Sequence, residues 1–214
     1  MGDNMNIDDI QFGNPREKHL KKIKRDKGGK LKLALEKGIL QRMPEQPKNS
    51  SEQTRKEIEY LDRIGDALTP EQRRFCELME NNHYDFFEIV GKRLGLGVDK
   101  KEIKKWVGEI DPIVFYLKDK FNRPRPYQLA RALDIELNPQ ITTDANSGAY
   151  PSGHSMDFLI IIWKFIQMKP ELKGELNNLY KKIRSVRELS GVHYPSDRKA
   201  SEWLFKELVK NKIL

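Results

Sequence analysis

Apolar residues recur at helical spacing over most of the chain from residue 52 onward, and this pattern restricts the fold more than any other feature. Ile58, Leu61 and Leu68, for example, fall on one face of a helix. Thr69 then has the side chain and position of a helix cap. No segment alternates apolar and polar residues as a β-strand does, and residues 135–150 have the composition of a loop. The sequence therefore predicts an all-α fold.

Two further helices are expected to be long. A capping box at Asp99 and Glu102 begins one that should continue to Leu117, with a kink at Pro112. The other should run from residue 175 to 189.

The N-terminal quarter of the chain differs in charge from the rest. Residues 1–50 hold 12 Lys and Arg against 7 Asp and Glu, while the whole chain has a net charge of +8. We predict a basic arm and linker over residues 1–50, partly disordered, and a helical domain over residues 51–214. Residues 16–32 could contact nucleic acid or an anionic membrane, but the absence of interleaved aromatic residues favours a solvated arm.

The sequence also contains features that indicate the cellular location of the protein. The longest apolar run, Phe158 to Trp163, is far shorter than the roughly 20 residues that span a bilayer. No secretory signal is visible near the N-terminus, and the single Cys76 fits a reducing compartment. We expect a cytoplasmic protein. No Cys/His cluster indicates a metal site.

One short segment has the features of an anion-binding helix start. Tyr150-Pro151-Ser152-Gly153-His154 stands where a loop enters an apolar helix, and the first turn of a helix offers free N–H groups and positive potential. Ser152 adds a hydroxyl donor, Gly153 permits close approach to the backbone, and His154 is placed to donate a proton to a leaving group. Taken alone, a helix cap beside an ordinary polar residue is the simpler interpretation.

A second segment pairs a histidine with a carboxylate. Arg187, His193 and Asp197 span the end of one helix, a turn and the start of the next. A carboxylate bound to one imidazole nitrogen fixes the tautomer and stabilises positive charge while the other nitrogen attacks phosphorus. Taken alone, the pair has a simpler explanation, in which Asp197 is an acidic residue favoured at a helix start and His193 is an ordinary turn residue.

Two cations precede these segments. Lys118 and Arg125 are separated by six residues, and Arg125 is followed by proline. Arginine can hold two phosphate oxygens and lysine acts as a point charge. Arg123 offers a rival register, but Tyr116 stands seven residues before it, so we favour Lys118 and Arg125.

Together, in this order and within 80 residues, the three motifs resemble the signature of the type-2 phosphatidic acid phosphatase superfamily, which includes class A acid phosphatases and vanadium haloperoxidases. The resemblance covers about residues 84–210 and implies a helical bundle without a cofactor, whose pocket accepts phosphate or vanadate. It implies that His193 is the nucleophile that forms a phosphohistidine, that Asp197 orients it, and that His154 is the general acid. The implied phosphate-binding residues are Lys118, Arg125, Ser152, Gly153 and Arg187. Val186 stands where the family usually has serine.

The expected function is that of a soluble, metal-independent phosphatase acting on a small phosphate monoester or diphosphate. Alternatives are a vanadate-dependent haloperoxidase, a lipid-phosphate phosphatase docked on a membrane by its basic arm, and a non-catalytic nucleic-acid-binding or scaffold protein. A homodimer is possible. The remaining histidines, His19 and His83, have no partner at metal-ligand spacing, and we assign them to surface or helix-end positions.

Overall fold

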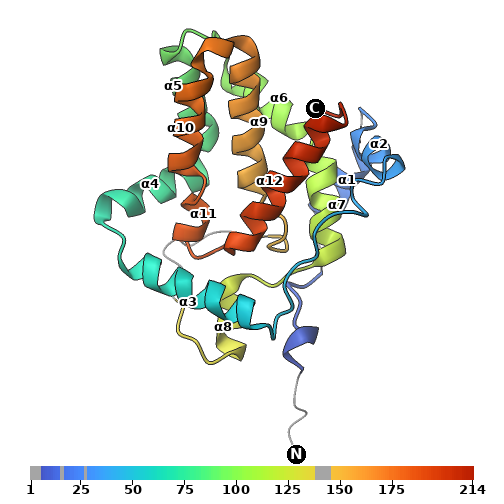
Figure 1. The fold of residues 1–214 in the computed structure, drawn as a ribbon, viewed down its shortest axis with the longest axis vertical. Helices are drawn as coiled ribbons and strands as arrows, with labels where there is room; N and C mark the ends of the chain where they lie inside the picture. Colours follow the sequence, from blue (N-terminus) through green and yellow to red (C-terminus); the bar gives the residue numbers. More distant parts are fainter. Residues whose placement is uncertain (1–5, 15–16, 27, 138–145) are drawn as a thin grey trace, which may run out of the picture.

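The computed structural model describes residues 6–14, 17–26, 28–137 and 146–214, and in these residues every regular element is a helix (Figure 1). In chain order the elements are η1 Ile7–Asp9, α1 Glu17–Lys24, α2 Lys30–Glu36, α3 Glu52–Asp66, α4 Pro70–Asn81, α5 His83–Arg93, α6 Lys100–Gly108, α7 Asp111–Phe121, α8 Pro126–Ala132, α9 Gly153–Met168, η2 Pro170–Leu172, α10 Lys173–Ile183, α11 Val186–Leu189 and α12 Pro195–Lys210. The predicted all-α fold is confirmed.

Helix α9 forms the centre of the bundle, and it lies between α10 and α12 in Figure 1. Its apolar residues point in several directions, which is typical of a buried helix. Ile160 joins one core cluster with α7 and α12, whereas Phe158 and Phe165 join a second cluster with α5, α6 and α10. The apolar run Phe158–Trp163 therefore belongs to a helix of the core. Among the helices of the described segments, none has the length and apolar character needed to cross a membrane.

The basic N-terminal segment packs onto the helical domain over its described residues. Helix α1 lies against α7, and Leu31, Ile39 and Leu40 are buried in the same core cluster as α7 and α12. The prediction of a partly disordered arm separate from residues 51–214 is wrong for this part of the chain. Burying apolar surface stabilises a protein by about 25 cal/mol per Å². This gain favours docking of the N-terminal segment on the helical domain over its solvation, despite the positive charge of the segment.

Two predicted long helices are each divided in the structure. The first ends at Gly108, and α7 begins at Asp111 with Pro112 in its first turn, where proline is tolerated because the missing N–H has no helical partner. A new helix rather than a kink therefore carries Lys118. The second predicted helix breaks near Ser185, between α10 and α11. Part of the expected loop at 135–150, residues 138–145, lies outside the described residues.

Candidate active site

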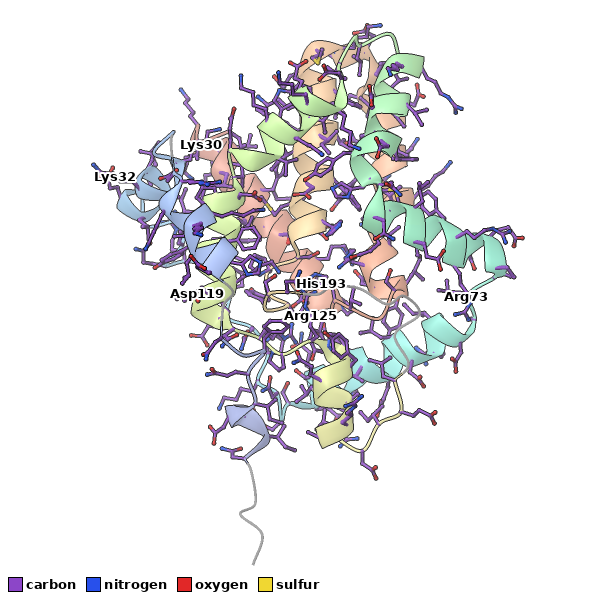
Figure 2. The ribbon with its side chains drawn as sticks, turned by 180° about the vertical axis from the view of Figure 1, so that it is seen from behind. Lys30, Lys32, Arg73, Asp119, Arg125 and His193 are labelled. Carbon is purple, nitrogen blue, oxygen red and sulfur yellow. The ribbon has the colours of Figure 1, made fainter. Side chains whose placement is uncertain are left out.

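The three motifs meet at one cavity of about 320 Å³, whose walls come from α1, α4, α5, α7, α9 and α11 and from the chain next to them. Of the predicted site residues, those on the wall are Lys118, Arg125, Gly153, His154, Arg187 and His193. Ser152 and Asp197 are fully buried behind it. Figure 2 shows Arg125 and His193 next to each other in the interior of the molecule, whereas Lys30 and Lys32 lie at its edge.

Hydrogen bonds determine which nitrogen of His193 carries the proton. Its Nε2 lies 2.8 Å from Nη1 of Arg125, and its Nδ1 lies 2.9 Å from Oδ2 of Asp197. Because a guanidinium can only donate, Nε2 must be the acceptor and Nδ1 must carry the proton. Burial is the main cause that lowers the pKa of His193 well below its ordinary value, and Arg125 adds to this. His193 is thus neutral, and the lone pair of its Nε2 faces Arg125, which also lines the cavity.

Asp197 also forms a hydrogen bond outside its contact with His193. Its Oδ2 also accepts the backbone N–H of Tyr194 at 3.0 Å, which anchors the start of α12. Helix α12 begins at Pro195, and Ser196 lies in its first turn.

Arg123, which the sequence interpretation set aside, completes this arrangement. It is fully buried, and its Nη1 donates to Oδ1 of Asp197 at 2.6 Å. Its guanidinium lies 3.7 Å from the centre of the Tyr194 ring and 3.5 Å from Oε2 of Glu57 on α3. Glu57 in turn accepts the backbone N–H and the hydroxyl of Ser196. Glu57 and Arg123 therefore fix the orientation of Asp197 from the side away from the cavity.

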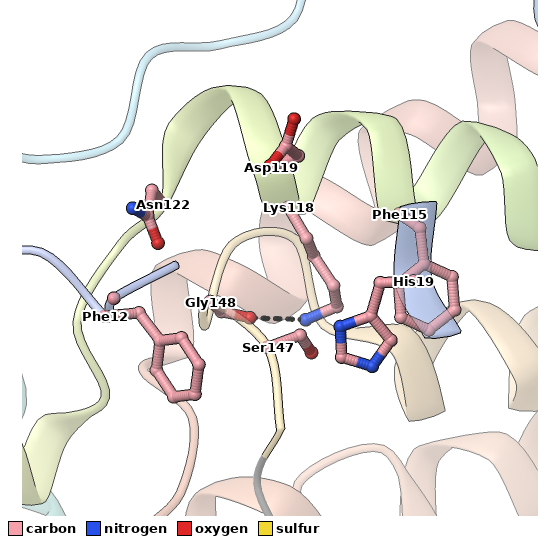
Figure 3. Close-up of a pocket in the computed structure, with 9 residues that line it drawn as sticks. Phe12, His19, Phe115, Lys118, Asp119, Asn122, Ser147 and Gly148 are labelled. Atoms are coloured by element: carbon pink, nitrogen blue, oxygen red, sulfur yellow. Dashed lines mark hydrogen bonds between the residues drawn. The ribbon is translucent and has the colours of Figure 1, made fainter. Parts of the chain in front are cut away.

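Lys118 is buried, and its ammonium donates to the carbonyl of Gly148 at 2.6 Å (Figure 3). A β-carbon at Gly148 would lie 3.1 Å from the backbone oxygen of Lys118 and 3.2 Å from the nitrogen of Arg123, so this close approach needs glycine. Burial first, and Arg125 second, lower the pKa of Lys118 well below its ordinary value. A bound anion would reverse that shift.

Arg125 is held by the loop that precedes α9. Its Nε and Nη2 both donate to the carbonyl of Ser147, at 3.0 and 2.8 Å, and Nη1 donates to the carbonyl of Val192 at 2.9 Å. The guanidinium therefore has one fixed orientation, in which it faces His193.

Ser152 and Gly153 differ in position. Oγ of Ser152 caps α9 by accepting the backbone N–H of Ser155, and it lies behind the wall. Because accepting this N–H leaves the hydroxyl proton of Ser152 free to donate, its role in phosphate binding stays a prediction. Gly153 faces the cavity, and a β-carbon added there would lie 3.7 Å from Cε of Lys118.

Arg187 reaches the cavity from α11 and forms an ion pair with Glu80 of α4. Burial lowers the pKa of Arg187 to about 9, so the guanidinium remains charged at neutral pH. Val186 packs into the apolar core cluster beside α5 and α10, and it faces no part of the cavity.

His154 lies across the same cavity, on the first turn of α9. Its Nε2 is 3.4 Å from the carbonyl oxygen of Glu80. Burial, followed by the nearby imidazole of His83, lowers the pKa of His154 to about 3. His154 is therefore neutral at pH 7 in these surroundings, whereas a general acid must carry a proton when the leaving group departs.

His19 and His83 are not at the surface, although His83 does stand at a helix end as the first residue of α5. Both are buried and both line the cavity. His19 stacks on Phe115, with ring centres 4.7 Å apart, and His83 lies beside Asp157. Partners from distant parts of the chain cannot be read from sequence spacing. Within the described segments, no three His, Cys, Asp or Glu side chains form a group suited to a metal ion.

Comparison with solved structures finds a similar fold in "the first transmembrane PAP2 type phosphatidylglycerolphosphate phosphatase from Bacillus subtilis". The two chains are 17% identical, the match covers 89% of this chain and 95% of that one, and the TM-score is 0.49. No family model matches the sequence, and no curated protein sequence is detectably similar to it. The functional assignment therefore depends on the geometry of the site itself.

Proposed function

We propose that this protein is a metal-independent phosphatase that hydrolyses small phosphate monoesters, or a small diphosphate, through a phosphohistidine at His193. The observation that carries the proposal is the hydrogen bonding of His193: Nδ1 is held by Asp197, and Nε2 is an unprotonated nitrogen that accepts from Arg125 on the wall of the cavity. This is the arrangement that a nitrogen nucleophile needs.

The charges around the cavity support binding of a phosphoryl group. Lys118, Arg125 and Arg187 all line it, and each is at least nine-tenths buried. Phosphoryl transfer requires positive charge on the equatorial oxygens, and fixed cations in a buried site supply it without reorganisation. Arg125 is bonded to His193 and Arg187 to Glu80, so a phosphate would exchange these contacts for its own oxygens.

The reaction then has two steps. Nε2 of His193 forms a bond to phosphorus while the bond to the leaving oxygen breaks, and that oxygen takes a proton from His154. Asp197 stabilises the positive charge that develops on the imidazole. In the second step water attacks phosphorus, the N–P bond breaks, and the proton of water returns to His154. Phosphate and an alcohol are the products.

The test is phosphate release from 4-nitrophenyl phosphate and from a panel of sugar, nucleoside and lipid phosphates, with added chelator. We expect turnover by the wild type and none by His193→Ala. Lys32→Met is the matched control, because Lys32 is an exposed cation at the edge of the molecule, away from the cavity. Equal rates for wild type and His193→Ala would refute the proposal.

A further inference from the structure

A second imidazole–carboxylate pair lies in the cavity, outside the predicted motifs. Nε2 of His83 is 3.3 Å from Oδ2 of Asp157, and both residues line the cavity together with His154. The exposed fractions of the two side chains are 7% and 16%. Tyr84 brings its hydroxyl to within 3.5 Å of the same carboxylate oxygen.

The pair is also next to the expected general acid. The rings of His83 and His154 meet edge to face, with centres 4.6 Å apart. His154 and Asp157 are three residues apart on α9 and therefore share one face of that helix, while His83 begins α5. The two helices thus bring two imidazoles and one carboxylate together in the cavity that His193 also lines.

This arrangement addresses a chemical problem of the site. At neutral pH His154 is unprotonated, because burial and His83 lower its pKa to about 3. Two imidazolium rings in contact would repel each other, so the two rings can hold one proton between them. Of the two, His83 is the one with a carboxylate beside it.

We propose that His83 and Asp157 form a proton-holding pair that supplies the proton which His154 delivers to the leaving group. His83 is in this account a positioning and proton-storing residue that acts through His154. The inference depends on the proposed phosphatase function and specifies how its acid is loaded.

The proton balance is complete. As the P–O bond breaks, its electron pair goes to the leaving oxygen, which takes the proton from His154, and the His83–Asp157 pair returns a proton to that ring. When water attacks the phosphohistidine, water gives up one proton, which restores the charge on the pair. No other reactant is needed.

Other charged groups in the cavity modulate where the proton resides. The titratable and charged side chains that line it besides the pair are His19 and Lys22 of α1, Glu80 of α4, Tyr84 of α5, Asp111 and Lys118 of α7, His154 of α9, Arg187 of α11, and Arg125 and His193. A dianionic phosphate near Lys118 and Arg187 would favour a proton on the imidazoles. Loading of the acid is thus expected to accompany substrate binding.

The test compares leaving groups. A poor leaving group, such as an alkyl alcohol, needs a proton as the bond breaks, whereas 4-nitrophenolate does not. We expect His83→Asn and Asp157→Asn to lower kcat/KM for an alkyl phosphate at least about tenfold more than for 4-nitrophenyl phosphate. We also expect Asp157→Asn to move the pH optimum for the alkyl ester to lower pH, because Asp157 raises the pKa of His154. His154→Asn should show the same selectivity between the two esters. The double variant with His83→Asn and His154→Asn should lose little more kcat/KM than His154→Asn alone.

His19→Asn is the matched control, because His19 is a buried imidazole of the same cavity that stacks on Phe115 instead. Its effect, whatever its size, should be the same for both esters. Phosphate binding measured by calorimetry establishes that each variant is folded, and should any His83 variant not fold, Asp157→Asn carries the test. Equal losses on the two esters in the variants of the pair would overturn the inference while leaving the phosphatase intact. A wild type without activity on any ester would instead overturn both.

Discussion

Arg123 and Asp197 form an ion pair in which both side chains are fully buried and Nη1 lies 2.6 Å from Oδ1. The pair joins the short segment after α7 to the first turn of α12, and it orients the carboxylate that holds His193. Removing one partner of such a pair leaves a buried charge without compensation, which typically costs about 3–5 kcal/mol.

We therefore predict that Arg123→Met lowers the free energy of unfolding by about 3 kcal/mol or more and also lowers kcat. Denaturation in urea, monitored by circular dichroism, measures the first effect, and phosphate release measures the second. Arg131→Met, on the last turn of α8, is a matched control that should change neither. A stable, fully active Arg123→Met would show that Asp197 needs no support from Arg123.

Replacement of Asp197 by asparagine should impair catalysis, and it should also lower the free energy of unfolding because Arg123 loses its buried charge partner. The amide can reverse the tautomer of His193, which would move the lone pair from Nε2 to the buried nitrogen. We expect kcat to fall by about 10³-fold or more, with a smaller change in KM. Steady-state kinetics on 4-nitrophenyl phosphate measure both, and a rate close to that of the wild type would contradict the assigned tautomer.

The pH dependence of stability follows from the two buried histidines of the site. Burial lowers the pKa of His154 to about 3 and that of His193 well below its ordinary value, so the unfolded chain binds more protons than the folded chain once the pH falls below about 6.5. The free energy of unfolding should therefore decrease from pH 6.5 toward pH 3, by up to about 1.4 kcal/mol per pH unit for each histidine.

Urea denaturation at pH 7.0, 6.0 and 5.0 measures how steeply the free energy of unfolding falls with pH. His154→Asn is the comparison, because this variant should take up roughly one proton fewer than the wild type when it unfolds. The slope of the variant should be shallower. Identical slopes would mean that His154 titrates normally in the folded protein.

Binding of an oxyanion should be coupled to proton uptake. Lys118 and His154 both have lowered pKa values in the folded protein, chiefly because of burial, and a bound anion favours their charged forms. Calorimetry of phosphate and vanadate binding in buffers of different ionisation enthalpy should detect net uptake at pH 7. Lys118→Met should weaken binding at least about tenfold, since it removes a buried charge partner. Binding without any proton uptake would contradict the assigned charge states.

Packing of the N-terminal segment gives a separate prediction. Leu40 is buried in the core cluster shared with α7 and α12, so Leu40→Ala should destabilise the whole protein by about 2–5 kcal/mol. Leu20→Ala, at an exposed position of α1, is the control with a small effect. An unchanged midpoint for Leu40→Ala would restore the interpretation of residues 1–50 as a separate arm.

Local signals were sufficient to predict most helices and the three motifs. The cap at Thr69 and the start of α9 after Ser152 depend on neighbouring residues, and both are found as expected. The division between α6 and α7 was missed because apolar spacing continues across it. The packing of the helix that contains Leu31 was missed, because the charge of residues 1–50 favoured a solvated arm.

The supporting residues of the site depend on contacts between distant segments. Glu57 follows Thr54 and precedes Leu61 on the buried face of α3, and a carboxylate at such a position signals a buried partner. That signal was available but does not name Arg123. The juxtaposition of His83 with Asp157 depends on how α5 meets α9, for which the sequence contains no local signal.

The most direct test of the account is to trap the phosphoenzyme. Mixing the protein with excess 4-nitrophenyl phosphate and stopping the reaction in strong base preserves a phosphohistidine, because its N–P bond is labile in acid and stable in alkali. Mass spectrometry should then find one phosphoryl group, located on His193 and absent from His193→Ala. A wild type that turns over substrate without any such adduct, or with the group on another residue, would contradict the mechanism.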